Sequence, residues 1–345
     1  MLVPIKIENG EIIKDEENAV LKTFKELGLR EDHLEEFLRK NISVLFDDEE
    51  QETLLIVGQQ VSDTERSRCD LIAINDSGDI VVIEIKRDVE DIKRRKESFE
   101  FQAMKYVSAY AKIKTREELV SRIFAPYVEK HKSEYSDLKN LNPKEIATRK
   151  LNEFLRETNA LDTFNKKQIV ILVASEFDNQ TLSTVAWLCS NNDIRFRCIK
   201  TTPVEIGSKK LLKIEKIIPP TTLEDFYTEV PDKIETSYEP GQKQERSSTQ
   251  RVNLPRMPKL FEWGLLKKGD ILELKGHEED SAAEVVDPNT VKYKNIMMTY
   301  NQWGQKITGW SSICIYEWAK KKGTNETIGE LRDRKMQEQA KEKDV

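Results

Sequence analysis

Residues 70–86 read DLIAINDSGDIVVIEIK, and this stretch decides the fold class of the chain. Two apolar, β-rich runs flank the tight turn at Asn75-Asp76-Ser77-Gly78, which predicts a β-hairpin. Because side chains alternate along a strand, Glu84 and Lys86 project from one face. Asp70 begins the partner strand, so we expect it to approach Glu84 at the open end of the hairpin.

These three charged residues match what hydrolysis of a phosphodiester requires. A bound Mg²⁺ ion neutralises charge on the phosphate and activates water. Such an ion takes one or two carboxylates together with water and substrate phosphate, and a nearby lysine can orient the attacking water. The alternative is that Glu84 and Lys86 form an exposed pair on a half-buried strand. The apolar run IVVI before them favours the site, because polar residues there are costly without a purpose.

The segments around the hairpin predict an α/β domain. Upstream, apolar patterning and the turn Asn9-Gly10 predict a hairpin over 5–14, helices over 15–27 and 31–41, and a strand over 54–57. Downstream, we expect a charged helix over 88–112 that continues as helix to about 130, a polar loop over 133–147, strands over 167–175, 194–199 and 211–218, and a helix over 179–191. The succession of strand, helix and strand predicts a βαβ unit with parallel strands.

The totals indicate a charged protein of two or three domains. The chain has 345 residues, of which 38% are hydrophobic and 34% charged. No run approaches the roughly 18 apolar residues of a membrane helix, and the N-terminus lacks a secretion signal. The four cysteines form no CxxC pair, which is typical of reduced thiols, so we expect a cytoplasmic protein without a membrane partner. The net charge of −6 argues against a broad DNA surface but allows a local basic groove.

The composition changes near residue 230. Residues 230–254 have few large apolar side chains and several Pro, Gly, Ser and Gln, so they predict a linker between a domain over 1–229 and a second domain. The second domain, over 255–335, has a leading helix, several short strands and a helix near 298–304, which predicts a small α+β fold. The polar tail over 336–345 predicts a frayed helix or disorder.

The hairpin resembles the D-x(n)-E-x-K core of the PD-(D/E)XK nuclease superfamily. The segments LEEFLRKN, IVGQQV and CDLIAINDSGDIVVIEIKR are similar to those of the NucS-type endonucleases, and QAMKYVSAY is similar to the Q-x-x-x-Y helix of many such nucleases. The segment QIVILVASEFDNQTLSTVAWLCSNNDIRFRCIK is similar to bacterial members, and the resemblance covers about residues 15–225. It implies a restriction-endonuclease-like mixed sheet flanked by helices.

The resemblance also implies roles for the residues of the hairpin. Asp70 and Glu84 would bind Mg²⁺, or Mn²⁺ in its place, and Lys86 would orient water and stabilise the transition state. A glutamate on the upstream helix would complete the site. Glu35 is favoured, and Glu31, one turn earlier on the same face, is the substitute. The alternative for either glutamate, with equal weight, is that it is a charged side chain on the solvated face of a helix.

Further residues would meet DNA. By the resemblance, Gln102 would contact the DNA backbone or the active site. For Tyr106, one turn later, the alternative is that the ring only packs against its neighbours. Arg87 and the run Lys93-Arg94-Arg95-Lys96 are candidates for phosphate contacts. The alternative for this run is a solvated face of a helix.

The second domain resembles the RAMA domain, a module found attached to restriction enzymes and methylases. The matching features are GLLKKGD at 264–270, the strand after it, and Gly309-Trp310-Ser311. The resemblance implies a domain that reads DNA, with base modification as its target. Trp303 and Trp310 are the candidates for stacking on a flipped base. The alternative is that the tryptophans build the core of a domain of this size.

Three functions are compatible with these expectations. The first is a modification-dependent, type IV-like restriction endonuclease against phage DNA, acting as a homodimer because cutting two strands needs two active sites. The second is a repair nuclease directed by a mismatch or a DNA structure. The third is a DNA-binding module that has lost catalysis, against which the intact Asp70, Glu84 and Lys86 argue.

Overall fold

The structure, a computed structural model, describes residues 4–8, 11–14, 17–46, 52–62, 68–88, 90–91, 97–138, 140–191, 195–219 and 254–343. The chain divides into two compact units. One comprises Met1–Leu45, Glu52–Pro219 and Trp310–Ser312, and the other comprises Phe46–Gln51, Pro220–Gly309 and Ile313–Val345. The expected linker over 230–254 lies outside the described residues except for residue 254.

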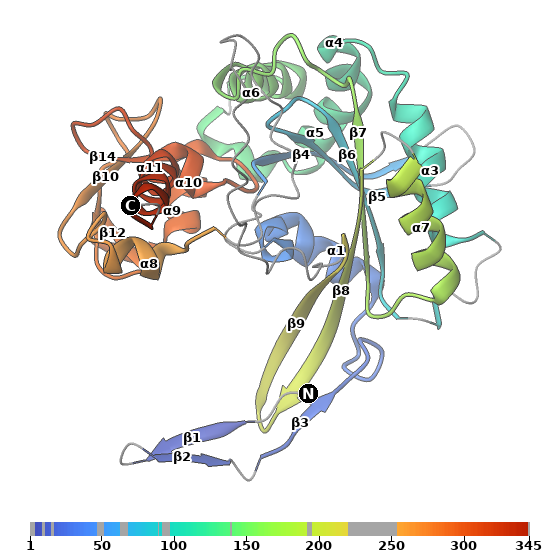
Figure 1. Ribbon diagram of the computed structural model, residues 1–345. Helices are drawn as coiled ribbons and strands as arrows, with labels where there is room; N and C mark the ends of the chain where they lie inside the picture. The colour runs from blue at the N-terminus through green and yellow to red at the C-terminus, as the bar shows by residue number, and fades with distance from the viewer. Residues whose placement is uncertain are drawn as a thin grey trace. The chain divides into compact units, whose positions relative to one another are not determined.

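The first unit is built on a seven-stranded mixed sheet (Figure 1). Its strand order is β3-β8-β7-β6-β5-β4, and β9 pairs with β8. Strands β4, β5 and β6 are antiparallel neighbours, whereas β6, β7 and β8 run parallel. The expected parallel βαβ unit is therefore confirmed. The strands are β3 (Ala19–Leu21), β4 (Leu54–Ser62), β5 (Arg68–Asn75), β6 (Ile80–Lys86), β7 (Gln168–Ala174), β8 (Arg195–Ile206) and β9 (Lys209–Ile218).

The turn between β5 and β6 is closed by its own side chains. The Asn75 side-chain oxygen accepts hydrogen bonds from the backbone N–H groups of Ser77 and Asp79 at 3.1 and 2.8 Å. Asp79 in turn accepts from the backbone N–H of Lys167 at 2.8 Å, which fixes the entry to β7. All seven residues of β6 are buried, because β5 and β7 pair with its two edges and helices cover the sheet.

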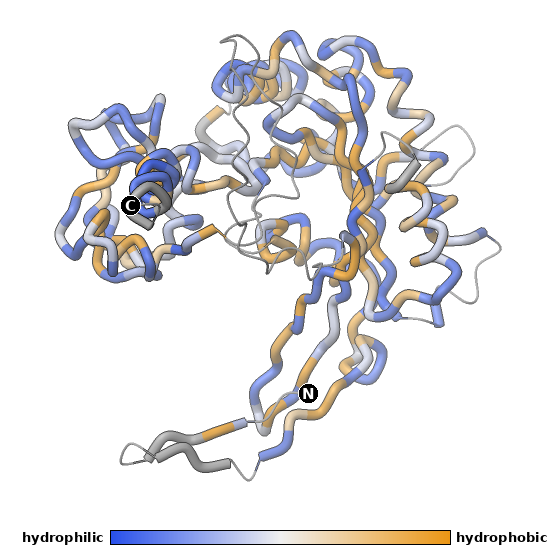
Figure 2. Tube along the Cα trace, viewed as in Figure 1, coloured by the Kyte–Doolittle hydropathy of each residue, from blue (hydrophilic) through white to orange (hydrophobic). Residues whose placement is uncertain are grey.

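Helices pack on both sides of this sheet. Helices α3 and α7 contact one another and the strands β6, β7 and β8, and Figure 1 shows them on the opposite side of the sheet from α1 and α6. In Figure 2 the hydrophobic trace is concentrated along the central strands between these layers. The helices of eight or more residues are α1 (Glu31–Lys40), α3 (Phe99–Tyr110), α6 (Pro143–Glu157) and α7 (Asn179–Asn191), and the shorter ones are η1 (Ile42–Leu45), α4 (Arg116–Leu119), η2 (Val120–Phe124), α5 (Ala125–Lys130) and η3 (Lys132–Leu138).

Two expectations for the N-terminal region have different outcomes. The predicted hairpin over 5–14 is confirmed, since β1 (Ile5–Glu8) and β2 (Glu11–Lys14) pair antiparallel. The predicted helix over 15–27 is wrong. Residues 19–21 instead form β3, whose Leu21 is in register with Val204 of β8. Pairing with a strand far along the chain supplies the backbone hydrogen bonds that a local helix would have made.

One further helix prediction is confirmed in part, and one loop prediction is wrong. Of the helix expected over 88–112 with more helix to about 130, residues 90–91 and α3 are helical, and α4, η2 and α5 follow one another without a break over 116–130, but residues 111–115 interrupt the run. The polar segment expected as a loop over 133–147 contains η3 and the start of α6. Asn142 caps α6, because its side chain accepts from the Glu145 backbone N–H at 3.0 Å while the Glu145 carboxylate accepts from the Asn142 backbone N–H at 2.9 Å.

The second unit contains a five-stranded antiparallel sheet of order β13-β12-β11-β10-β14. Leu272, Val285 and Val291 of this sheet form a buried core together with Trp303 and Tyr316. The strands are β10 (Ile271–Leu274), β11 (Ala283–Val285), β12 (Thr290–Tyr293), β13 (Ile296–Thr299) and β14 (Ala319–Lys321), and the helices are α8 (Met257–Glu262), α9 (Tyr300–Thr308), α10 (Ile315–Trp318) and α11 (Ile328–Lys343). The chain is thus a mixed α/β protein with a second, small sheet. Within the described ranges, no helix has the length and apolar character needed to cross a bilayer.

Candidate active site

The hairpin brings Asp70, Glu84 and Lys86 together at one end of β5 and β6. Leu71 is in register with Ile83, so the next residues outward are Asp70 and Glu84. The Lys86 Nζ atom lies 2.7 Å from Glu84 Oε1 and 3.6 Å from Asp70 Oδ2. Asp70 Oδ2 also accepts a hydrogen bond of 2.7 Å from the backbone N–H of Ile85. The three charged side chains that the sequence predicted therefore form one cluster.

This cluster is buried. Asp70 is 4% exposed, and Glu84 and Lys86 are 0% exposed. Moving charged groups out of water costs several kcal/mol for each group unless partners compensate. Lys86 compensates with its contacts to the two carboxylates, with a hydrogen bond of 2.6 Å to the Ile85 carbonyl, and with the Phe99 ring 5.4 Å away. The alternative of an exposed pair on a half-buried strand is not what the structure shows.

Helix α1 adds two carboxylates from the positions that the sequence favoured. Glu31 Oε1 lies 3.7 Å from Lys86 Nζ, and the Glu31 side chain is 34% exposed. Glu35 is buried and lies near Asp70, to which it is connected through Gln60. Burial, followed by the negative charge of Asp70, raises the pKa of Glu35 to about 7. Both glutamates of α1 therefore face the cluster, Glu31 on the lysine side and Glu35 on the aspartate side.

Arg39 fixes α1 against the rest of the unit. Its guanidinium donates to Glu36 at 2.8 Å, to Glu134 at 2.6 Å and to the Tyr127 hydroxyl at 2.9 Å. The hydrogen bond from Arg39 is the main cause that lowers the pKa of Glu36 to about 2. Arg39 itself is buried, so it forms a planar fork between α1 and the α5–η3 region. Glu35 lies four residues earlier on the same helix, one turn away from this anchor.

Gln60 is the member of the cluster that the sequence did not point to. The side-chain amide nitrogen of Gln60 donates to Glu35 Oε2 in a short hydrogen bond and to Asp70 Oδ1 at 3.2 Å. It therefore bridges α1 and β5. The only signal in the sequence was its place in the segment IVGQQV, which did not separate it from Gln59.

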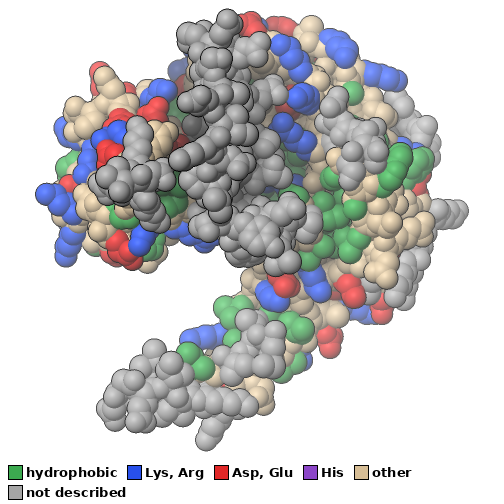
Figure 3. Space-filling view, in the orientation of Figure 1, with side chains coloured by type: hydrophobic (Ala, Val, Ile, Leu, Met, Phe, Trp, Pro, Cys, Tyr) green, Lys and Arg blue, Asp and Glu red, His purple; other side chains and the backbone are tan. Residues whose placement is uncertain are grey.

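The residues expected to meet DNA have internal partners. Gln102 donates to the Tyr106 hydroxyl at 3.1 Å, and this hydroxyl donates to the carbonyl of Arg68 at 2.7 Å, on the strand that carries Asp70. Arg87 donates to Asp91 at 3.1 Å and to the Leu29 carbonyl at 3.1 Å. The run at 93–96 lies outside the described residues. On the face drawn in Figure 3, Lys and Arg side chains are interspersed with Asp and Glu.

The two tryptophans expected to stack on a base are both buried. Trp303 is 0% exposed in the core of the second unit, and its indole N–H donates to the Ser281 carbonyl at 2.8 Å. Trp310 is 5% exposed and packs edge-on against Phe154, with ring centroids 5.3 Å apart, within the first unit. The structure therefore gives both rings packing roles, and neither offers an open face to a base in this conformation.

The carboxylates of the cluster suit a hard divalent cation whose remaining ligands come from substrate and water. Within the described part of the chain, no three His, Cys, Asp or Glu side chains are arranged as a metal site. Asp70 and Glu84 nevertheless converge, since the single ammonium of Lys86 contacts both. Mg²⁺ sites that act on phosphates use one or two protein carboxylates, with the remaining ligands from water and the phosphate. The residues present fit such an ion.

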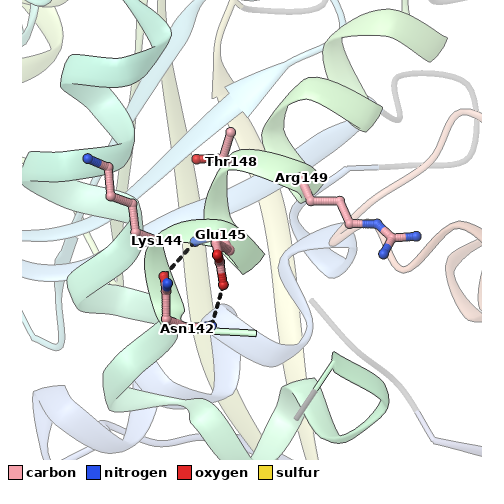
Figure 4. A pocket seen from close by; sticks show the side chains of 5 residues that line it. All are labelled: Asn142, Lys144, Glu145, Thr148 and Arg149. Carbon is pink, nitrogen blue, oxygen red and sulfur yellow. Dashed lines mark hydrogen bonds between the residues drawn. The ribbon is translucent and has the colours of Figure 1, made fainter. Parts of the chain in front are cut away.

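A separate hollow of about 360 Å³ lies over the start of α6 and is lined by Asn142, Lys144, Glu145, Thr148 and Arg149 (Figure 4). Figure 4 shows the Lys144 and Arg149 side chains pointing in different directions, while Asn142 and Glu145 are joined by the capping hydrogen bonds. None of the cluster's residues lines this hollow, and two of its five lining residues, Asn142 and Glu145, are used to cap the helix.

Comparisons of the chain with models of protein families, with curated proteins and with solved structures gave no match. A function for the chain therefore has to be argued from the geometry of the site.

Proposed function

We propose that the first unit is a metal-dependent phosphodiesterase of the PD-(D/E)XK kind that cuts DNA. The observation that carries this proposal is the convergence of Glu31, Asp70 and Glu84 on the buried ammonium of Lys86, within 2.7 to 3.7 Å. Glu35, which is buried and connected to Asp70 through Gln60, adds a fourth carboxylate to the neighbourhood. The excess of negative charge supports binding of a divalent cation, which would neutralise the phosphate and activate water.

The residues of the chain divide the work of the reaction. Asp70 and Glu84 would hold the cation, because their carboxylates already converge at one point. Lys86 would orient the attacking water and stabilise the charge that builds up on the phosphate. Attack by water on phosphorus breaks the bond to the leaving oxygen and gives a phosphate monoester and an alcohol. Burial of the cluster supports this role, since electrostatic interactions are stronger where water is excluded.

The similarity of the second unit to RAMA domains supports a sensing role for it. In this proposal the chain is a modification-dependent endonuclease, in which the second unit selects modified DNA. The buried state of Trp303 directs the search for the reading surface away from this ring and toward the exposed side chains of the second unit.

The test is cleavage of matched phage DNAs that are unmodified, methylated, or hydroxymethylated or glucosylated, with Mg²⁺ and with EDTA. Lys86→Ala is the active-site variant, and Lys114→Ala, at an exposed lysine of the same unit, is the matched control. We expect Mg²⁺-dependent cutting of a modified DNA that Lys86→Ala loses and Lys114→Ala keeps. Cutting that survives EDTA would overturn the metal mechanism.

The same assay separates the remaining alternatives. Equal cutting of all the DNAs would support the nuclease activity of the first unit but contradict a sensing role of the second unit. Cutting confined to mismatched duplexes would identify a repair nuclease. Binding without cutting of any DNA would leave a DNA-binding module.

A further inference from the structure

Gln60 has a backbone conformation that its side-chain type does not explain. Its φ angle is +53°, in the left-handed region that non-glycine residues rarely adopt. It lies inside β4, between Gln59, in register with Leu71, and Val61, in register with Cys69. The strand therefore continues on both sides of one strained residue, at the position beside Asp70. Strain at a single residue of a strand persists only where the surroundings enforce it, and it is concentrated at functional sites.

The strained backbone aims the Gln60 amide between two acids. The amide nitrogen has two hydrogens and donates to Glu35 Oε2 and to Asp70 Oδ1. Glu35 is 3% exposed and Asp70 is 4% exposed, so neither carboxylate has ready access to bulk water. The amide thus satisfies two buried oxygen atoms from two different elements, α1 and β5.

The neighbouring Gln59 shows that this arrangement is specific to one position. The Gln59 side chain donates to Glu36 at 3.2 Å and interacts with Lys130 and His131 at 3.0 and 2.9 Å. It also interacts with Glu35, so the two glutamines share this carboxylate, whereas the hydrogen bond to Asp70 comes from Gln60. Only Gln60 reaches a residue of the Asp70, Glu84 and Lys86 cluster through the contacts described.

A neutral hydrogen-bond donor between Asp70 and Glu35 has an advantage over a charged donor. A lysine or arginine would hold the two carboxylates but would also neutralise them and compete with a cation. An acidic side chain would repel them. An amide fixes the geometry and leaves the negative charge available to a metal ion.

We propose that Gln60 is a positioning residue of the active site, which holds the Asp70 and Glu35 carboxylates in the orientation that receives the divalent cation. This inference rests on the proposed nuclease function. Residues that orient metal ligands contribute about 10- to 100-fold to metal affinity or activity.

The experiment compares Gln60→Gly, Gln60→Asn and Gln59→Gly with the wild-type chain. Glycine removes the amide and suits a left-handed backbone, so Gln60→Gly should remain folded. Asparagine keeps an amide and tolerates the same φ angle but is one methylene shorter, so it serves as the second, conservative variant. The first readout is Mn²⁺ binding, followed by the loss of the free-ion signal in electron paramagnetic resonance. The second is kcat and KM for DNA as a function of Mg²⁺ concentration.

We expect Gln60→Gly to weaken Mn²⁺ binding by about 10- to 100-fold and to raise the Mg²⁺ concentration for half-maximal cutting, with little change in KM for DNA. Gln60→Asn should recover part of this loss, and Gln59→Gly, which keeps the bridge between Glu35 and Asp70, should weaken Mn²⁺ binding less than Gln60→Gly does. Wild-type affinity in Gln60→Gly, with cutting intact, would overturn the role of Gln60 alone. A wild-type chain that neither binds Mn²⁺ nor cuts DNA would overturn the proposed function and this inference with it.

Discussion

The ammonium of Lys86 lies 2.7 Å from the carboxylate of Glu84, two residues earlier on the same buried strand. The spacing of two places both side chains on one side of β6, and the parallel strand β7 on its other edge makes this strand central in the sheet. Glu84 and Lys86 are both 0% exposed, so neither charge is hydrated by bulk water. The pair is therefore held together by its surroundings, which makes it sensitive to the loss of either partner.

Lys86→Ala should destabilise the folded protein as well as abolish cutting. Removing one partner of a buried ion pair leaves an uncompensated charge and costs about 3–5 kcal/mol. Urea unfolding at neutral pH in EDTA measures this loss, with Lys114→Ala expected to change stability by less than about 0.5 kcal/mol. Added Mg²⁺ should stabilise Lys86→Ala more than the wild type, because a cation replaces the missing positive charge. A variant that is as stable as the wild type would show that the cluster is not buried in solution.

Glu35→Gln should change how stability depends on pH. The pKa of Glu35 is raised to about 7 from a usual value of 4.5, so the folded state holds this proton more tightly than the unfolded state. The stability associated with Glu35 is therefore present below about pH 4.5 and is lost as the pH rises through 7. At 1.36 kcal/mol for each pKa unit, the loss is on the order of 3 kcal/mol.

The measurement is the difference in unfolding free energy between Glu35→Gln and the wild type at pH 5 and pH 8. We expect the variant to be similar at pH 5 and more stable at pH 8. Glu36→Gln is the matched control, because the pKa of Glu36 is lowered to about 2 by Arg39 and its substitution should reduce stability at pH 8. A Glu35→Gln variant that is less stable than the wild type at pH 8 would contradict the raised pKa.

The hairpin was predictable from the sequence because its signals are local. The turn at 75–78 and the alternation of apolar and charged residues in β6 depend on neighbours within a few positions, and they sufficed to place Asp70, Glu84 and Lys86 together. The glutamates of α1 were also predictable, since a helix of regular period presents Glu31 and Glu35 on one face. These are the parts of the site for which spacing alone determines geometry.

The remaining parts depend on contacts that the sequence does not encode locally. The strand β3 is only three residues long and is defined by pairing with Val204 and its neighbours, far along the chain. Gln60 enters the site through a left-handed φ angle that glutamine does not favour. Helix α6 is a different case, because the capping box at Asn142 and Glu145 was present in the sequence, and the polarity of the segment concealed it.

Arg39→Lys should weaken both the fold and the site. Lysine keeps the charge but cannot form the planar fork that joins Glu36, Glu134 and Tyr127. We expect a loss of about 1–3 kcal/mol in unfolding free energy, because hydrogen bonds to charged groups are of that size. Lys40→Ala, which removes an exposed pair with Glu36 at 3.0 Å, should cost less than about 1 kcal/mol.

The effect of Arg39→Lys on catalysis separates anchoring from simple stability. If Arg39 positions α1, kcat should fall at a temperature where the variant is fully folded, whereas Lys40→Ala should retain wild-type kcat. Equal kcat in the two variants would mean that α1 holds its place without this fork.

Trp303→Ala should unfold or strongly destabilise the second unit. The ring is fully buried among the core residues, and its indole N–H is used by the Ser281 carbonyl. Truncating a buried Trp to Ala typically costs about 3–5 kcal/mol. Trp303→Phe retains most of the apolar contact but leaves the Ser281 carbonyl without this donor, so it should cost about 1–3 kcal/mol. Thermal unfolding measures both losses.

Trp187→Ala is the matched control, since this ring is 62% exposed on α7 and its removal should leave stability nearly unchanged. The same variants decide between packing and base stacking for Trp303. Packing predicts that loss of modified-DNA binding parallels loss of folded protein, with Trp303→Phe intermediate in both. A Trp303→Ala protein that melts like the wild type but no longer distinguishes modified DNA would show that the ring leaves the core to stack on a base.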